Sequence, residues 1–201
     1  MDWKGFERPG DPGTGGTRSV KVMIAGGFGT GKTTMVGSVS DIRPLTTEET
    51  LTRASAGVDP LVGVADKAET TVSLDFGKIS LNESLVLYLF GTPGQERFWF
   101  LWNGLFKGAL GAVVLVDTRR LSSSFRAIEE MERQDVPFVV ALNMFPDSRE
   151  HPVEEIRDAL DVAPHIPVVA FDARDRASSR DVLVALVEYL RDRPPVALEP
   201  R

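Results

Sequence analysis

The sequence predicts a three-layer α/β/α sandwich around a mostly parallel sheet of about six strands. Short apolar runs alternate with amphipathic stretches, and several runs are apolar on both faces, as strands covered by helices on each side should be. A glycine-rich loop follows the first apolar run, at a position where open α/β sheets bind ligands. At 201 residues, the chain suits one domain with a full core.

The elements can be placed by hydrophobic period and by turn and capping residues. Strands are expected over residues 20–25, 71–81, 85–90, 112–116, 138–142 and 168–171. Helices are expected over residues 33–39 and 46–56, after the cap at 122–124, from Pro152, and after Ser178 or Ser179. The helix at 46–56 rests on Thr46-Thr47-Glu48-Glu49, which resembles a capping box. The domain should cover residues 18–193, between a disordered leader (1–17) and a flexible tail (194–201).

Composition excludes several classes of function. The net charge of −6 gives no indication of nucleic-acid binding. The first residues lack the apolar core expected of a signal peptide, and the absence of cysteine removes disulfides, thiolate metal sites, prenylation and palmitoylation. We therefore expect a cytoplasmic monomer without a membrane anchor of its own, which only a partner could recruit to a membrane.

Residues 26–33 read G-G-F-G-T-G-K-T and match the phosphate-binding loop G-x-x-x-x-G-K-[ST], between an expected strand and an expected helix. In such a loop, backbone N–H groups surround phosphate oxygens, Lys32 would reach the β- and γ-phosphates, and the Thr33 hydroxyl would bind Mg²⁺. The expected nucleotide contacts here are Gly26, Gly27, Phe28, Gly29, Thr30, Gly31, Lys32, Thr33 and Thr34. The alternative is a chance glycine-rich turn.

A second motif, G-T-P-G-Q-E-R-F at residues 91–98, follows the expected central strand. With the phosphate loop, it resembles the second switch of Ras-like small GTPases, and the likeness covers residues 19–192. More narrowly, the chain is similar to the actinobacterial conservon GTPases, which are relatives of the bacterial polarity GTPase MglA. The resemblance implies that Gly94 contacts the γ-phosphate, that Gln95 orients the attacking water, and that Thr71 is a second magnesium ligand.

The resemblance also implies a guanine site, from an [NT]-K-x-D motif after the fifth strand. Asn143 is in place, but Met144 replaces the lysine and Pro146 replaces the aspartate, with Asp147 one residue late. A bulge would bring Asp147 to the base; otherwise Asp147 is a loop residue that caps the next helix. The family's last base loop is matched by three residues that would brace guanine and donate to its O6: Asp172, Ala173 and Arg174.

Two departures predict slow hydrolysis of GTP. Gly91 stands where the family has a magnesium-binding aspartate, so metal binding should be weakened unless Asp59, Asp66 or another carboxylate of the first switch substitutes. Phe28 would crowd the γ-phosphate. The candidates for an arginine finger in cis are Arg53 and Arg97, and the competing interpretation is that both are solvated surface arginines.

The segment 98–106 is apolar nearly all round as a helix, with Phe98, Leu101, Trp102 and Leu105 on one face and Trp99 and Phe106 away from it. It is either a partner surface or wholly buried. The resemblance implies a GTP/GDP switch with Mg²⁺, a Roadblock/LC7-type regulator and an upstream sensor kinase-like protein. Two alternatives stay open: a nucleotide-binding adaptor that rarely hydrolyses, and a P-loop ATPase or kinase.

Overall fold

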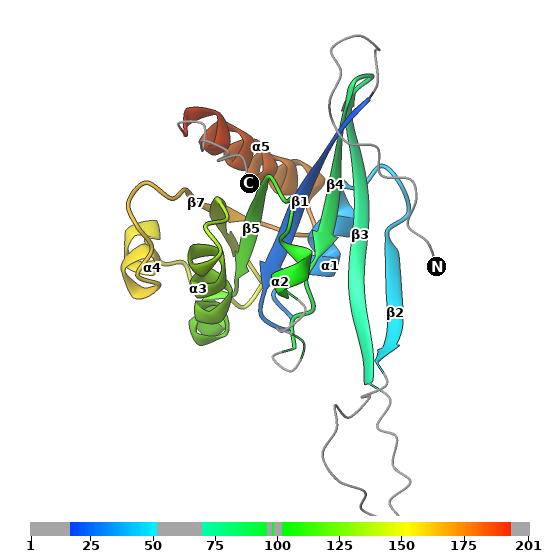
Figure 1. The fold of residues 1–201 in the computed structure, drawn as a ribbon. Coiled ribbons are helices and arrows are strands. Elements are labelled where there is room, and N and C mark those ends of the chain that lie inside the picture. Colours follow the sequence, from blue (N-terminus) through cyan, green and yellow to red (C-terminus); the bar gives the residue numbers. More distant parts are fainter. Residues whose placement is uncertain (1–16, 52–69, 96–97, 99–101, 194–201) are drawn as a thin grey trace, which may run out of the picture.

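The structure, a computed structural model, describes residues 17–51, 70–95, 98 and 102–193, with only the backbone path at 46–51, 70–73 and 103. Its strands are β1 (Arg18–Gly26), β2 (Leu45–Leu51), β3 (Thr70–Asn82), β4 (Leu85–Gly91), β5 (Gly111–Val116), β6 (Phe138–Asn143) and β7 (Val168–Phe171). They form one seven-stranded sheet in the order β2-β3-β4-β1-β5-β6-β7. β3 is antiparallel to both of its neighbours, and the other pairs are parallel, so the predicted α/β sandwich is confirmed (Figure 1).

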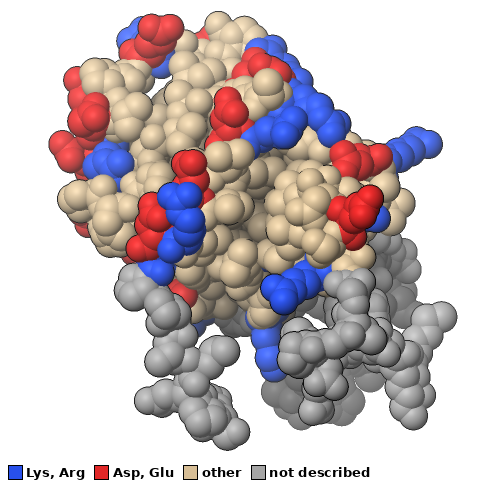
Figure 2. Space-filling model, turned by 90° about the horizontal axis from the view of Figure 1, so that it is seen from above, with Lys and Arg blue, Asp and Glu red and all other residues tan. Residues whose placement is uncertain are grey.

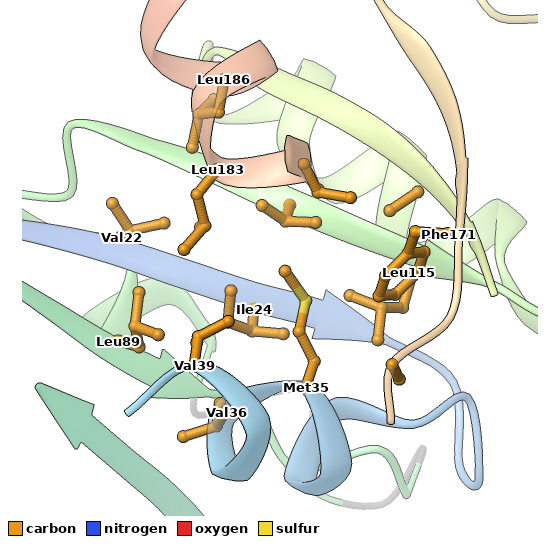
Figure 3. Close-up of a cluster of buried hydrophobic side chains, with 14 of the residues drawn as sticks. Val22, Ile24, Met35, Val36, Val39, Leu89, Leu115, Phe171, Leu183 and Leu186 are labelled. Carbon is orange, nitrogen blue, oxygen red and sulfur yellow. The ribbon is translucent and has the colours of Figure 1, made fainter. Parts of the chain in front are cut away.

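Helices cover both faces of the sheet. They are α1 (Lys32–Val39), α2 (Trp102–Leu105), α3 (Phe125–Arg133), α4 (Val153–Ala159) and α5 (Arg176–Asp192), with a 3₁₀ segment at Thr118–Ser123. β1 alternates between two cores: Val22 and Ile24 face α1 and α5, while Met23 and Ala25 face the side of α2, α3 and α4. Figure 3 shows the first core, where Met35 of α1 and Leu183 of α5 meet over the sheet.

One predicted element is wrong. Residues 45–51 form strand β2 instead of a helix over 46–56, and this strand accounts for the seventh member of the sheet. The segment is rich in β-branched threonine, and β2 pairs along seven positions of β3, from Leu45–Phe76 to Leu51–Thr70. A capping box lowers the free energy of a helix only by satisfying its first N–H groups, so ladder hydrogen bonds over the whole segment outweigh it.

The expected inward faces also need correction in places. Phe106 is buried and its ring packs edge-on against Trp102, because α2 ends at Leu105 and the chain turns there. The spacing of apolar residues in the sequence predicts Phe125 and Val187 on the inward faces of α3 and α5, but they are 42% and 45% exposed. The last helix begins earlier than predicted, at Arg176, where the Asp175 carboxylate accepts from the Ala177 N–H.

Charged side chains of both signs are interspersed with neutral residues on the face seen in Figure 2. This mixed surface does not test the expectation that the protein has no nucleic-acid partner. Among the described helices, none is long and apolar enough to cross a membrane.

Candidate nucleotide-binding site

The candidate site lies where β1, β4, β5 and β6 end, at the lower edge of the sheet in Figure 1. The phosphate loop leaves β1 at Gly26 and enters α1 at Lys32, between β4 and β5, which pair with β1 on either side. The second motif follows β4, and the base motif follows β6. The parallel strands β1, β4, β5 and β6 therefore bring three separate stretches of sequence to one edge.

Lys32 is held inside the phosphate loop. Its side chain is buried, and its ammonium group donates to the carbonyls of Gly26 at 2.9 Å and Gly27 at 2.6 Å. Burial lowers the pKa of Lys32 to about 8, and the charge of Asp75 partly offsets this effect. These carbonyls fix the lysine at the mouth of the loop, where phosphate oxygens would compete with them for its protons.

The other end of the loop is tied to β6. Asn143 is buried, and its Nδ2 donates to the Thr30 carbonyl at 3.0 Å while its Oδ1 accepts from the Ala173 N–H at 3.1 Å. Gly31 has a φ of +100°, and a Cβ atom there would overlap the Asn143 amide. Only glycine therefore suits this position, and one asparagine joins the phosphate loop to the loop after β7.

A carboxylate lies directly beside the predicted magnesium ligand. The Thr33 hydroxyl donates to Asp75 Oδ2 at 2.6 Å, and Asp75, on β3, is 7% exposed. Sequence reasoning missed Asp75. The available signal was its phase in the strand: Asp75, Gly77 and Ile79 form the buried face of β3, whereas the apolar Leu74 and Phe76 are only half-buried.

Gly91, at the end of β4, pairs with Asp75 across the antiparallel ladder. A Cβ atom on Gly91 would lie 3.0 Å from Asp75 Cβ and 3.1 Å from Asp75 Oδ2. The position that lacks the expected aspartate therefore faces a carboxylate from the neighbouring strand. Asp59 and Asp66, the two named candidates for this replacement, lie outside the described residues.

The second motif touches the phosphate loop. A Cβ atom on Gly94 would lie 2.6 Å from Lys32 Nζ and 2.9 Å from the Gly27 carbonyl oxygen. Gln95 comes next and is half-buried, and its carbonyl accepts from the Phe98 N–H at 3.0 Å. Phe28, in the loop itself, is 67% exposed.

The predicted guanine residues divide into two groups. Asn143 is engaged as described, and the Met144 N–H donates to the Phe171 carbonyl at 2.8 Å. Asp147 is mostly exposed, and its carboxylate is paired with the Arg119 guanidinium. The base motif is therefore held at Asn143 by hydrogen bonds to the phosphate loop and the loop after β7, and at Asp147 by the ion pair with Arg119.

That arginine belongs to a cluster that sequence reasoning missed. Asp117 directly follows β5 and has a fully buried side chain. It accepts two hydrogen bonds of 2.9 Å from the Arg119 guanidinium and two, of 3.3 and 3.4 Å, from the Arg120 guanidinium. These hydrogen bonds, Arg119 first, hold the pKa of the Asp117 carboxyl below its usual value. The Arg119 guanidinium also lies over the Phe145 ring, 3.9 Å from its centroid.

Arg120 extends from the same cluster to the phosphate loop, where its guanidinium donates to the Phe28 carbonyl at 3.4 Å. The only signal in the sequence was an aspartate directly after a fully apolar strand. Buried carboxylates need partners, and the two arginines that follow supply them.

In the last base loop, the expected O6 donor is already engaged, since the Ala173 N–H donates to Asn143. Asp172 pairs with Arg174 at 2.6 Å and accepts from its N–H, and these bonds lower the pKa of Asp172 to about 2. A base would have to share or displace these contacts. Of the remaining predicted residues, Thr34 is exposed on α1. Thr71 lies on β3 opposite Thr50, and its side chain is not described. Arg53 and Arg97 lie outside the described residues.

Comparison with known proteins agrees with this arrangement. Residues 24–193 match the family model described as "Conserved hypothetical ATP binding protein". An uncharacterised protein of Methanocaldococcus jannaschii is 25% identical over 126 residues, which are 62% of this chain and 69% of the relative. The Ras-related protein Rab-11C of Dictyostelium discoideum is 31% identical over 101 residues, 45% of each chain, so the match spans less than half of that relative.

Solved G domains share the fold. The G domain of the T. maritima FeoB iron transporter superposes with a TM-score of 0.58 at 18% identity, covering 86% of this chain and 99% of that one. The FeoB G domain of Methanococcus jannaschii gives 0.59 at 13% identity, covering 88% and 100%. The fold is that of P-loop GTPase G domains, and by its matching family model the chain belongs to the family of conserved hypothetical ATP-binding proteins.

Proposed function

We propose that the protein is a GTP-binding molecular switch that hydrolyses GTP slowly on its own. The observation that carries this proposal is the contact between Gly94 and the phosphate loop, next to Lys32 Nζ. A third phosphate at this position would have to engage or displace the backbone of the second motif. The conformation after β4 would then report whether GTP or GDP is bound, as ordered and released switch segments do in GTPases.

Within this proposal, the chain's own residues divide the work. Lys32 exchanges the Gly26 and Gly27 carbonyls for phosphate oxygens, and the loop N–H groups and the start of α1 surround the remaining charge. Thr33 and Thr71 hold Mg²⁺, which would neutralise the charge of the phosphates when bound. Gln95 orients the attacking water, and Arg53 is the candidate arginine finger.

Slow hydrolysis is proposed because Phe28 and Gly91 both depart from the GTPase pattern. Phe28 is exposed at the loop, where its ring would restrict access to the γ-phosphate. Gly91 leaves β4 without a carboxylate. An activating partner would then raise turnover, since an arginine supplied to the γ-phosphate accelerates this chemistry by roughly 10³- to 10⁵-fold.

By resemblance to the conservon GTPases, the partner would be a Roadblock/LC7-type regulator in a bacterial signalling system, with a sensor kinase-like protein upstream and a cytoplasmic location. The proposed partner surface is narrower than the aromatic segment, because Phe98, Trp102 and Phe106 are buried in the domain. Of the described residues of this segment, Gly104 is exposed and Leu105 is half-buried, while residues 99–101 lie outside the described residues.

A second candidate function is binding of adenine nucleotides, as an ATPase or kinase. The specific observation in its favour is the pairing of Asp147 with Arg119, which engages the carboxylate that would select guanine. A carboxylate that accepts from guanine N1–H and N2–H leaves adenine poorly paired, so this one contact decides selectivity.

Calorimetric titration of nucleotide-free protein with GDP, a GTP analogue and an ATP analogue separates the candidates. The switch proposal expects guanine nucleotides to bind at least tenfold more tightly than the ATP analogue. Equal or tighter binding of the ATP analogue would reverse the ranking. A separate assay of GTP turnover tests the adaptor that rarely hydrolyses: measurable turnover on adding a partner would exclude it.

A further inference from the structure

We propose that Asp75 is the carboxylate of the magnesium site, acting from β3 in place of a residue on β4. This inference rests on the proposed nucleotide-binding function and assigns a metal role to a residue that the motifs do not include. It begins from one contact: Asp75 Oδ2 accepts from the Thr33 hydroxyl at 2.6 Å.

The donor set fits the ion. Mg²⁺ binds hard oxygen ligands and is usually held by one or two carboxylates together with phosphates of the substrate. The threonine after the lysine of a phosphate loop supplies one such oxygen, and Asp75 places a carboxylate within hydrogen-bond reach of it. Among the described residues, no group of three or more His, Cys, Asp or Glu could hold a metal, so the ion should bind with nucleotide and not without it.

Burial and charge support a functional carboxylate. Asp75 is 7% exposed, at the end of the site where Lys32 is also buried, and the Asp75 charge acts on the Lys32 ammonium. A carboxylate taken out of water lowers the free energy of the fold only if it is well paired. A divalent cation beside Thr33 would add a charged partner for Asp75.

The ladder between β3 and β4 explains the missing aspartate. Asp75 and Gly91 are direct cross-strand partners, whose side chains project to the same side of the sheet. Any side chain at 91 would meet Asp75, with its Cβ 3.1 Å from Oδ2. The two positions therefore compete for one space, which the Asp75 carboxylate occupies. The inference predicts that the aspartate and the glycine can be exchanged between positions 75 and 91 with most of the magnesium response kept.

The competing explanation is that Asp75 only anchors Thr33 and α1. An anchoring role predicts loss of stability without a change in the response to magnesium. The experiment therefore measures the release of a fluorescent GDP analogue as magnesium is titrated, with EDTA as the metal-free limit. Its variants are Asp75→Asn, which keeps the shape and an acceptor oxygen, and the exchange Asp75→Gly with Gly91→Asp.

We expect Asp75→Asn to raise the magnesium concentration for half-maximal retention of GDP by about 10- to 100-fold, the usual loss when a group that supports a metal is removed. Its release rate in EDTA should match the wild type. The exchanged pair should recover most of the magnesium response. The matched control is Asp41→Asn. The Asp41 carboxylate accepts from the N–H of Ser80, which lies on β3 like Asp75, but Asp41 is away from the phosphate loop.

Three outcomes overturn the inference and leave nucleotide binding standing. The first is an unchanged magnesium response in Asp75→Asn, and the second is GDP release from Asp75→Asn that is accelerated over the wild type as much in EDTA as in magnesium. The third is no recovery of the magnesium response in the exchanged pair. If Asp75→Asn fails to fold, as judged by its melting curve, the exchanged pair decides the question alone. Failure of the wild type to retain GDP under any condition contradicts the proposed function itself. Mn²⁺ electron paramagnetic resonance gives a second readout, with GDP-dependent ion binding expected in the wild type and reduced in Asp75→Asn.

Discussion

The two ends of the candidate site have departed from the GTPase pattern in opposite ways. At the phosphate end the motif is intact in sequence, and the one missing group, the carboxylate expected at Gly91, is matched by Asp75 on the adjacent strand. At the base end Asn143 keeps its place, but the carboxylate Asp147 is paired with Arg119, and the expected O6 donor at Ala173 is taken.

The difference lies in what each end must recognise. Phosphates are bound by a fixed set of backbone N–H groups and positive charge. We expect this arrangement to tolerate a carboxylate supplied from a neighbouring strand, but not a change in the conformation of the loop itself. A base is read by a few donors and acceptors on one edge, so new pairings there alter selectivity without disturbing the fold. Substitutions at the two ends should therefore have different consequences.

The largest effect is expected at Gly31. Gly31→Ala would force a side chain into a left-handed conformation and against the Asn143 amide, so it should destabilise the domain by about 2–4 kcal/mol and abolish nucleotide binding. Thermal unfolding and GDP titration measure both. The matched control is Gly104→Ala on α2, where nothing lies within 4 Å of the added methyl group and the melting temperature should hold or rise. If Gly31→Ala were stable and bound nucleotide, the phosphate end of the site would tolerate substitution, and the proposed difference between the phosphate end and the base end would be wrong.

Asn143→Ala tests the joint between the two ends. It leaves the Thr30 carbonyl and the Ala173 N–H without their partner, and each buried unpaired group costs about 1–3 kcal/mol. Urea unfolding should show this loss, while Asn82→Ala, at the exposed end of β3, should change stability by less than about 0.5 kcal/mol. Equal effects of the two variants would show that Asn143 does not join the loops.

A smaller effect on nucleotide binding is expected at Arg119. Arg119→Ala releases Asp147 from its ion pair, so the ratio of GDP to ADP affinity should change by about tenfold, the scale of one charged hydrogen bond, while the magnesium response stays constant. The variant also removes two hydrogen bonds from the buried Asp117 and should lower stability, so the affinity ratio is measured where the variant is folded. Competition titrations measure the ratio. Arg126→Ala, in an exposed pair with Glu129, is the control. A constant ratio would show that the base end does not use Asp147 at all.

The smallest effect concerns pH. Since hydrogen bonds from Arg119 lower the pKa of Asp117, the ionised carboxylate stabilises the fold above its unfolded pKa of about 3.8, and this stability is lost as the pH falls through the folded value. Asp117→Asn should therefore be less stable than the wild type at pH 7 and pH 5, and the gap should narrow below pH 4. Urea midpoints at the three pH values give the answer, and a gap that widens in acid would contradict it.

Local patterns predicted most of the fold because they record burial. Alternation and fully apolar runs placed the parallel strands, and the phosphate loop fell between β1 and α1 as expected. Residues 45–51 were misread because a helix cap is a local signal, whereas the β2–β3 ladder depends on a partner distant in sequence. Asp75 and Arg119 were missed for a related reason: their contacts with Thr33 and Asp147 cross 42 and 28 residues, and no single motif contains both partners.

The most direct test of the account is the release rate of a fluorescent GDP analogue from the wild-type protein, in magnesium and in EDTA. If the phosphate end is a working metal–nucleotide site despite Gly91, release in EDTA should be at least tenfold faster than in magnesium. Equal rates in the two conditions would mean that no metal acts with the nucleotide here, and the phosphate end would then have lost its function along with its aspartate.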